Sequence, residues 1–177
     1  LICIAGYVLF YIMIAFSQIY AKSAPTVSEA GYAMGLGFSP QIFTALLMFS
    51  AVSLAITITI SGKYIDKVGR RIWLIWTTVG VALFGLAWPY FLDNEATTSL
   101  FWFLMIGMGL IGMGYGPLAS FLPELFPTHA RYSGASLTYN ISGLFGASVA
   151  AIIALPLNAN YGLKGVGIYL TLNAVLS

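Results

Sequence analysis

The chain has 177 residues, of which 60% are hydrophobic and only 7% are charged, and its net charge is +2. A water-soluble domain carries about 25% charged residues, because its surface must be hydrated. This composition excludes an ordinary soluble globular domain and favours a protein that folds in a lipid bilayer.

Uncharged runs divide the chain into six apolar segments. Each of the first five is at least 21 residues long, and a helix of that length, at about 1.5 Å per residue, crosses the hydrocarbon core of a bilayer. The sixth run has 13 residues, which cover about two thirds of a crossing. We predict an all-α membrane protein with six transmembrane helices at about 1–21, 40–61, 72–91, 98–122, 133–156 and 165–177, the last one incomplete.

The first two spans carry polar side chains at helical spacing. Tyr7 and Tyr11 lie four residues apart in the first span, so they share one face of the helix. The second span is predicted to begin at the Ser-Pro pair 39–40, which is a typical helix start, and it carries Ser50 and Ser53. Polar groups in lipid bond to their own helix, pair with a neighbour or face a cavity. These four residues are therefore candidate substrate contacts.

The link between the second and third spans, GKYIDKVGRR at 62–71, holds five of the charged side chains. Gly62 is predicted to let the chain leave the second span in a left-handed conformation. Two interpretations stay open: the bases keep the link on the cytoplasmic side, or the acid among them forms a structural latch. The residues that carry both interpretations are Gly62, Asp66, Lys67, Gly69, Arg70 and Arg71.

The fourth span is rich in glycine ahead of a proline, with Gly112, Gly116 and Pro117 in its second half. Glycine weakens a helix and permits close approach of a neighbour. This tract predicts a helix that bends or moves, with ordinary close packing as the alternative. The span is predicted to end at the two prolines that bracket Glu124, since proline removes a backbone donor.

The link at 62–71 and the loop at 123–131 fall on the same side of the membrane, because two spans separate them. That side receives five bases, whereas the other receives Lys22 and Lys164 together with the acids Asp93 and Glu95. The positive-inside rule therefore places both links in the cytoplasm. We predict an ion-pair network there, with separate solvated loops as the alternative. The predicted members are Asp66, Arg70, Arg71, Glu124 and Arg131.

The fifth span is predicted to end near Pro156, followed by a turn-rich linker, and Asn140 within it is a further candidate substrate contact. None of the complete spans carries an ionisable Asp, Glu, His, Lys or Arg well inside the membrane. A proton carrier needs a titratable group along its path. We expect that group to lie in a part of the protein that this chain does not include.

The two charged segments resemble a known family. GKYIDKVGRR resembles the signature loop of the major facilitator superfamily, Gly-x-x-x-Asp-Arg/Lys-x-Gly-Arg-Arg/Lys, although Lys67 stands where arginine is commoner and lacks the planar fork that grips a carboxylate. PELFPTHARYSGASLTYN resembles the segment between the tenth and eleventh helices of the metabolite:proton symporter branch. The resemblance implies the C-terminal half of a twelve-helix fold, a six-helix bundle built as a 3+3 inverted repeat. In the family, these loops form a charge network that braces the cytoplasmic helix ends.

The resemblance implies a secondary active transporter, a proton-coupled symporter that moves a small polar metabolite such as a carboxylate or zwitterion by alternating access. A sugar-porter-like facilitator and a sensor on a transporter scaffold are the alternatives. The chain begins without Met and ends inside an apolar run, so we expect a fragment. The implied partners are the bilayer of the cell (inner) membrane, the N-terminal six-helix half, a small-molecule substrate and protons.

An enzyme or a channel is disfavoured. The one histidine lies in a loop, no span holds a carboxylate, and neither a phosphate-cradling loop nor a selectivity ring is visible. We therefore expect no catalytic residue, no cofactor, no metal site and no nucleic-acid partner.

Overall fold

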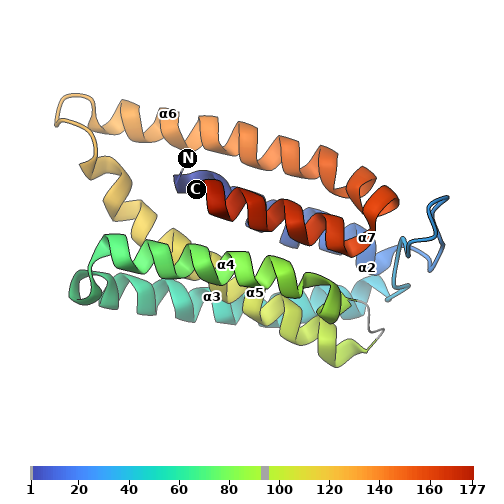
Figure 1. Ribbon diagram of the computed structural model, residues 1–177. Helices are drawn as coiled ribbons and strands as arrows, with labels where there is room; N and C mark the ends of the chain where they lie inside the picture. The colour runs from blue at the N-terminus through green and yellow to red at the C-terminus, as the bar shows by residue number, and fades with distance from the viewer. Residues whose placement is uncertain (1, 93–95) are drawn as a thin grey trace.

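The computed structural model describes residues 2–92 and 96–177, and the regular structure of this part is helical (Figure 1). Within it, the one β interaction is an isolated bridge between Val27 and Ala33. The η elements are short π-helical turns inside continuous helices. The elements in chain order are α1 (Ile2–Tyr11), η1 (Ile12–Phe16), α2 (Ser17–Lys22), α3 (Pro40–Val68), α4 (Arg70–Leu92), α5 (Thr97–Glu124), α6 (Arg131–Gly143), η2 (Leu144–Ser148) and α7 (Val149–Leu176).

Four helices within the described residues have the length and the apolar composition of membrane spans. Large apolar side chains on them are exposed, including 71% of Met48 and 68% of Trp76. Apolar surface of this extent is unfavourable in water and is covered by lipid in a bilayer. The four spans are Ile4–Lys22, Pro40–Val68, Arg70–Leu92 and Thr97–Glu124.

The second span is longer than predicted. Helix α3 passes through Gly62 and ends at Val68, so the prediction that Gly62 takes a left-handed conformation is wrong. Gly69 supplies the break instead, with a φ of 93° that residues other than glycine rarely adopt. The predicted link at 62–71 is therefore a helix end followed by a one-residue turn.

The helix that contains the predicted span 133–156 also ends later than predicted. The helix continues through Pro156, where the sequence predicted its end, and Pro156 is exposed there. A backbone in a bilayer satisfies its hydrogen bonds best within a helix, which favours continuation past a single proline. The chain breaks at Gly162, whose φ is 68° and ψ is −170°. The predicted turn-rich linker is thus reduced to one glycine, and the last helix follows it directly.

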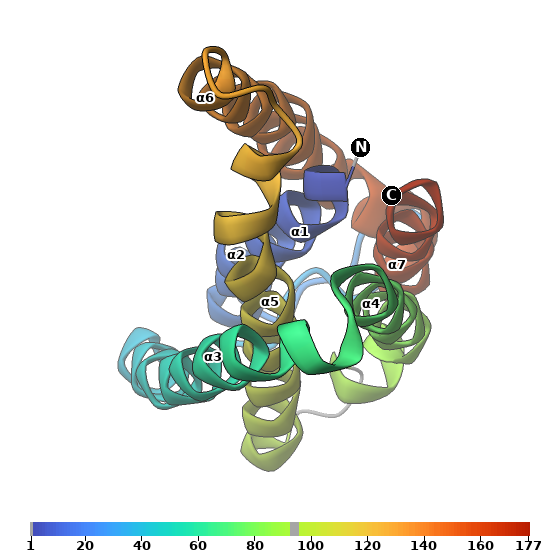
Figure 2. The ribbon, with the colours of Figure 1, turned by 90° about the vertical axis from the view of Figure 1, so that its left-hand side faces the viewer.

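The long helices run side by side, and the end-on view shows their arrangement (Figure 2). Helix α3 packs along α5, α4 packs against both α5 and α7, and α1 contacts α5, α6 and α7. On one side of the bundle, α3 and α6 stand on either side of α2 and α5. We call this side, the surface of η1, α2 and α5 between α3 and α6, the open face.

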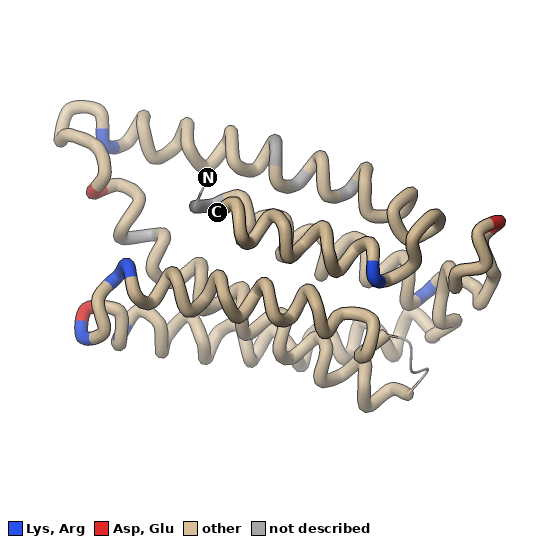
Figure 3. Tube along the Cα trace, viewed as in Figure 1, with Lys and Arg blue, Asp and Glu red and all other residues tan. Residues whose placement is uncertain are grey.

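Charged residues gather mainly at one end of the bundle (Figure 3). This charged end comprises the turn at Gly69, the helix ends beside it, and residues 125–130 between α5 and α6. The opposite end comprises the loop 23–39 and the break at Gly162. Asp93 and Glu95, which the sequence assigns to the opposite end, lie outside the described residues.

Candidate functional site

Arg70 joins three helices at the charged end. Gly69 turns the chain so that α4 begins with Arg70 beside the end of α5. Its Nη1 donates a hydrogen bond to Oε2 of Glu124, the last residue of α5. Its Nε lies 3.8 Å from Oδ1 of Asp66 in the last turns of α3. One guanidinium thus links α3, α4 and α5.

These ion pairs are open to water. The exposed fraction of the side chain is 33% for Arg70, 51% for Glu124 and 74% for Asp66. Arg70 is the first residue of α4 and Glu124 the last residue of α5, so both lie outside the apolar spans predicted at 72–91 and 98–122. The hydrogen bond from Arg70 lowers the pKa of the Glu124 carboxyl, and the charge of Arg131 acts in the same direction. The carboxylate therefore stays ionised at neutral pH, in a contact that water can replace.

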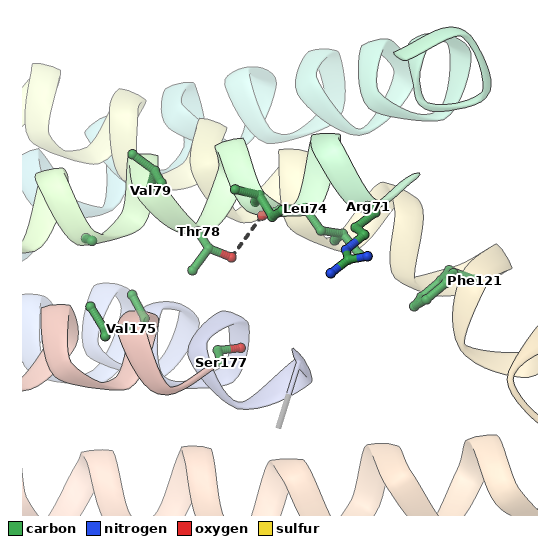
Figure 4. A pocket seen from close by; sticks show the side chains of 10 residues that line it. Arg71, Leu74, Thr78, Val79, Phe121, Val175 and Ser177 are labelled. Atoms are coloured by element: carbon green, nitrogen blue, oxygen red, sulfur yellow. Dashed lines mark hydrogen bonds between the residues drawn. The ribbon is translucent and has the colours of Figure 1, made fainter. Parts of the chain in front are cut away.

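Arg71 faces away from this cluster. It lines a groove of about 670 Å³ between α4, Phe121 of α5 and the end of α7, and Figure 4 shows its guanidinium directed into that groove. Successive residues of a helix point about 100° apart, so Arg70 and Arg71 belong to different surfaces. Among the described residues Arg71 forms no ion pair, and the structure does not bring it to Glu124 as the sequence predicted.

Two further bases of the charged segments, Lys67 of the signature loop and Arg131 of the predicted network, form no ion pair in the described part of the chain. The ammonium of Lys67 lies 5.7 Å from the ring centroid of Tyr64, a cation–π contact rather than a carboxylate contact. Arg131 begins α6, close enough to Glu124 for its charge to act on that carboxyl. The compact cluster is therefore Asp66, Arg70 and Glu124.

Aromatic side chains of three helices meet where the first span was predicted to contact substrate. Tyr7 of α1 lies edge-on to Tyr115 of α5 and to Tyr139 of α6, with centroid distances of 6.1 and 6.3 Å. Phe10 contacts both Tyr115 and Tyr11, and 38% of Tyr11 is exposed. The packing therefore adds Tyr115 and Tyr139 to the candidates Tyr7 and Tyr11.

Asn140 lies exposed on α6, one residue after Tyr139. Its Nδ2 donates to the carbonyl oxygen of Ser136 at 2.8 Å, and its Oδ1 accepts no hydrogen bond from the described residues. An exposed acceptor next to the aromatic cluster is suited to a polar ligand.

Ser50 and Ser53 form hydrogen bonds to backbone carbonyls inside the bundle instead. Ser50 is buried and its hydroxyl donates to the carbonyl of Leu47 at 2.7 Å. The hydroxyl of Ser53 donates across to the carbonyl of Met105 in α5 at 3.0 Å. Both hydroxyls are satisfied by the backbone, so their geometry gives no support for contact with substrate.

The glycine tract of α5 sits in close contact with α3. A Cβ added to Gly112 would overlap the hydroxyl of Thr57, and one added to Gly116 would overlap that of Ser61. Helix α5 continues through both glycines and through Pro117 to its end. Close helix packing accounts for the glycines at this interface, and bending of α5 stays a prediction.

Gln18 is a candidate that the sequence alone did not suggest to us. It lines a groove of about 430 Å³ on the outside of α2, together with Ala15, Ile19, Lys22 and Ser23. A glutamine inside an uncharged run is itself a signal, since an amide in lipid needs a partner or a cavity.

Residues 1–170 match the sequence profile of the Major Facilitator Superfamily. The chain belongs to the major facilitator superfamily. The family that the two charged segments predicted is therefore confirmed, and so is the all-helical membrane fold. No solved structure matches the chain.

The superfamily relatives that we compared are named as transport proteins. The chain is 91% identical, over all of its 177 residues, to a Haemophilus influenzae protein named for metabolite transport, of which it covers 40%. It is 38% identical over 99% of its length to the inner membrane metabolite transport protein YhjE of Escherichia coli, of which it covers 39%. It is 31% identical over 119 residues, 66% of its length and 23% of the relative, to the proline/betaine transporter of Escherichia coli.

The chain spans about two fifths of the length of the curated relatives that it matches over its whole length. Superfamily membership and the names of these relatives point to a transporter rather than an enzyme as the complete protein.

Proposed function

We propose that the complete protein is a secondary active transporter that moves a small polar metabolite, a carboxylate or a zwitterion, across the inner membrane by alternating access and proton symport. Membership of the superfamily and the names of the relatives support transport of a metabolite. The proline/betaine relative supports a zwitterion. Because the complete spans of this chain hold no titratable acid or base well inside the membrane, the proton-coupling residue belongs to the N-terminal half of the complete protein.

The observation that carries the proposed mechanism is the bridge from Arg70 to Asp66 and Glu124. Alternating access requires that contacts at each mouth of the path form and break. An ion pair that is already open to water meets this requirement, because water solvates both charges when they separate. The bridge therefore acts as a gate contact that braces the ends of α3, α4 and α5 while this mouth is closed.

The gate lies on the cytoplasmic side. Five of the seven bases of the chain are at the charged end, and the positive-inside rule assigns that end to the cytoplasm. The links at 62–71 and 123–131 are then cytoplasmic, and the loop 23–39 is on the outer side.

The substrate contacts that this half contributes are on the aromatic cluster. Tyr7, Tyr11 and Asn140 come from α1 and α6, and the ring contacts with Tyr115 and Tyr139 hold Tyr7 in place. Aromatic rings with phenol and amide groups beside them bind a small polar metabolite through apolar contact and a few directed hydrogen bonds.

Transport is tested with the complete protein in proteoliposomes. Counterflow of labelled carboxylates and zwitterions is measured with and without an imposed inward proton gradient. We expect saturable uptake of at least one compound, and accumulation against its own gradient only when the proton gradient is present. Uptake of a sugar at a rate independent of the proton gradient would indicate a facilitator. Substrate binding without uptake would indicate a sensor, and a gated current would indicate a channel.

A further inference from the structure

The groove beside α2 belongs to the open face of the bundle. Gln18 and Lys22 are four residues apart in α2, so their side chains share one face of the helix, and both line the groove of about 430 Å³. In Figure 2, α2 lies between α3 and α6, on the side away from α4 and α7. We place the rest of the complete protein against this face, which α4 and α7 do not cover.

An aromatic ring positions the ammonium of Lys22. Its Nζ lies 5.5 Å from the ring centroid of Phe43, a fully buried residue of α3. A ring face attracts a cation without neutralising its charge. Among the described residues no carboxylate forms an ion pair with Lys22. Its positive charge is therefore not cancelled by this part of the chain, and its side chain lines the groove.

The helix end itself does not require this lysine. Basic side chains in the last turn of a helix often bond to its terminal carbonyl groups. Here the backbone N–H and the hydroxyl of Ser23 both donate to the carbonyl of Ile19, at 2.9 and 2.7 Å. Capping by Ser23 leaves the ammonium of Lys22 for another role.

Lys164 provides a contrast at the same end of the bundle. It lines a different groove, with Leu157, Ile168 and Leu172 among its neighbours. That groove is on α7, on the far side of the bundle from the open face (Figure 2). A lysine on a lipid-facing helix anchors it at the membrane interface through its long side chain. The two lysines have the same charge and lie near the same end of the bundle, but they line different surfaces.

We infer that Gln18 and Lys22 form a capture site for the carboxylate group of the substrate, an inference that rests on the proposed transport function. The ammonium pairs with the carboxylate, and the Gln18 amide donates a second hydrogen bond to it. Hydrogen bonds between ionised groups are stronger than neutral ones. The site selects anionic and zwitterionic metabolites over neutral ones at the outer side, before they reach the uncharged aromatic cluster around Tyr7.

The test measures equilibrium binding to the complete protein in lipid nanodiscs by calorimetry. Succinate is compared with succinamide, and glycine betaine with choline, because the second compound of each pair lacks the carboxylate. We expect the protein to prefer at least one carboxylate probe over its counterpart. Lys22→Gln should weaken binding of that probe roughly tenfold, and Gln18→Leu several-fold, as expected for a charged and a neutral hydrogen bond. Lys22→Arg should retain most of the affinity, and binding of the counterpart should not change.

Lys164→Gln is the matched control, since it removes the same charge at the same end and should leave every affinity unchanged. The capture site is overturned if Lys22→Gln binds the carboxylate probe as tightly as the unmodified protein, if Lys164→Gln loses as much affinity, or if the unmodified protein binds neither carboxylate probe. Uptake into proteoliposomes separates this site from the proposed function. If the carboxylate probe binds in a Lys22-dependent way but is not taken up, the proposed transport function is contradicted and the capture site is not. If the probe is taken up but Lys22→Gln keeps the same preference for the carboxylate, the capture site is contradicted and the transport function is not.

Discussion

The two ends of the bundle hold their connecting segments in different ways. At the charged end, Arg70 links the turn at Gly69 to Glu124 through groups that are 33% and 51% exposed. At the opposite end, Asn158 is 1% exposed, and its Nδ2 donates to the carbonyl of Ala33 at 3.1 Å. One end uses charges in contact with water, and the other uses a buried neutral hydrogen bond.

Two more contacts complete the attachment at the opposite end. The hydroxyl of Ser28 donates to the carbonyl of Ala159 at 2.8 Å. The ring of Tyr32 lies against Gly162, where the last two helices meet. The loop 23–39 is therefore fastened to the junction of these helices by hydrogen bonds and by packing.

This difference indicates which end can exchange its contacts. Water replaces the partners of exposed charges as they separate, so the cluster around Arg70 can open readily. Breaking a buried hydrogen bond leaves its donor without a partner and costs about 1–3 kcal/mol. We therefore expect the charged end to open and close during transport, while the opposite end of this half moves as one body.

Replacing Gly162, at the junction of the last two helices, should have the largest effect on stability among the proposed substitutions. A side chain at φ 68° and ψ −170° is strained, and its Cβ would lie 2.6 Å from Cδ1 of Tyr32. We expect Gly162→Val to lower the free energy of unfolding of the complete protein by about 3 kcal/mol. The measurement is fluorescence-monitored unfolding in mixed micelles.

Gly6→Ala is the control for this change, because Gly6 is helical and has no neighbour within 4 Å of an added Cβ. It should leave the unfolding midpoint unchanged or raise it. A midpoint for Gly162→Val equal to that of the unmodified protein would contradict a rigid attachment at this junction.

Removing the buried amide should loosen the same end by a smaller amount. Asn158→Leu loses the hydrogen bond to Ala33, and we expect a loss of about 1–3 kcal/mol in the stability of the loop attachment. Hydrogen exchange of the backbone amides in the loop 23–39 measures it. Asn160→Leu is the matched control, since Asn160 is exposed and its Nδ2 donates to the carbonyl of Pro156 in its own helix. Equal exchange rates in the two variants would show that Asn158 does not anchor the loop.

Changing the charged end should have the smallest effect on stability and a selective effect on transport. We expect Glu124→Gln to leave the unfolding midpoint almost unchanged, because the pair is exposed, and to slow transport several-fold because the gate contact is weakened. The double variant Arg70→Glu with Glu124→Arg should recover part of the rate, because it restores an ion pair in reverse order. Lys63→Gln, at the same end, is the control. Transport by Glu124→Gln at the rate of the unmodified protein would remove the gate assignment.

The pH dependence of this pair has a defined sign. Arg70 lowers the pKa of Glu124 from the ordinary glutamate value of 4.5. The small stabilisation from the pair is therefore complete above that value and is lost as pH falls through the lowered pKa. The difference in unfolding midpoint between the unmodified protein and Glu124→Gln should stay constant near neutral pH and disappear in acid.

Much of the fold could be predicted because it depends on local properties of the chain. The length of each apolar run predicted the helices, and the Ser-Pro pair predicted the start of α3, where the Ser39 hydroxyl accepts a hydrogen bond from the Ile42 N–H at 3.4 Å. Helix ends were less predictable. Gly62 and Pro156 are both breaker residues, yet both lie exposed inside helices. In a bilayer the backbone satisfies its hydrogen bonds best within a helix, so a helix can continue past residues that would end it in water.

By itself, the sequence determined that the protein folds in lipid, that it is helical, which superfamily it belongs to and at which end charge gathers. These properties follow from composition and from short contiguous motifs. Only the tertiary structure decided that Arg70 rather than Arg71 meets Glu124, that the Ser53 hydroxyl is used against α5, and that Lys22 shares a groove with Gln18. The reason is rotational. Each residue turns the direction of a helical side chain by about 100°, and the rotation of one helix against its neighbours is set by contacts between residues far apart in the chain.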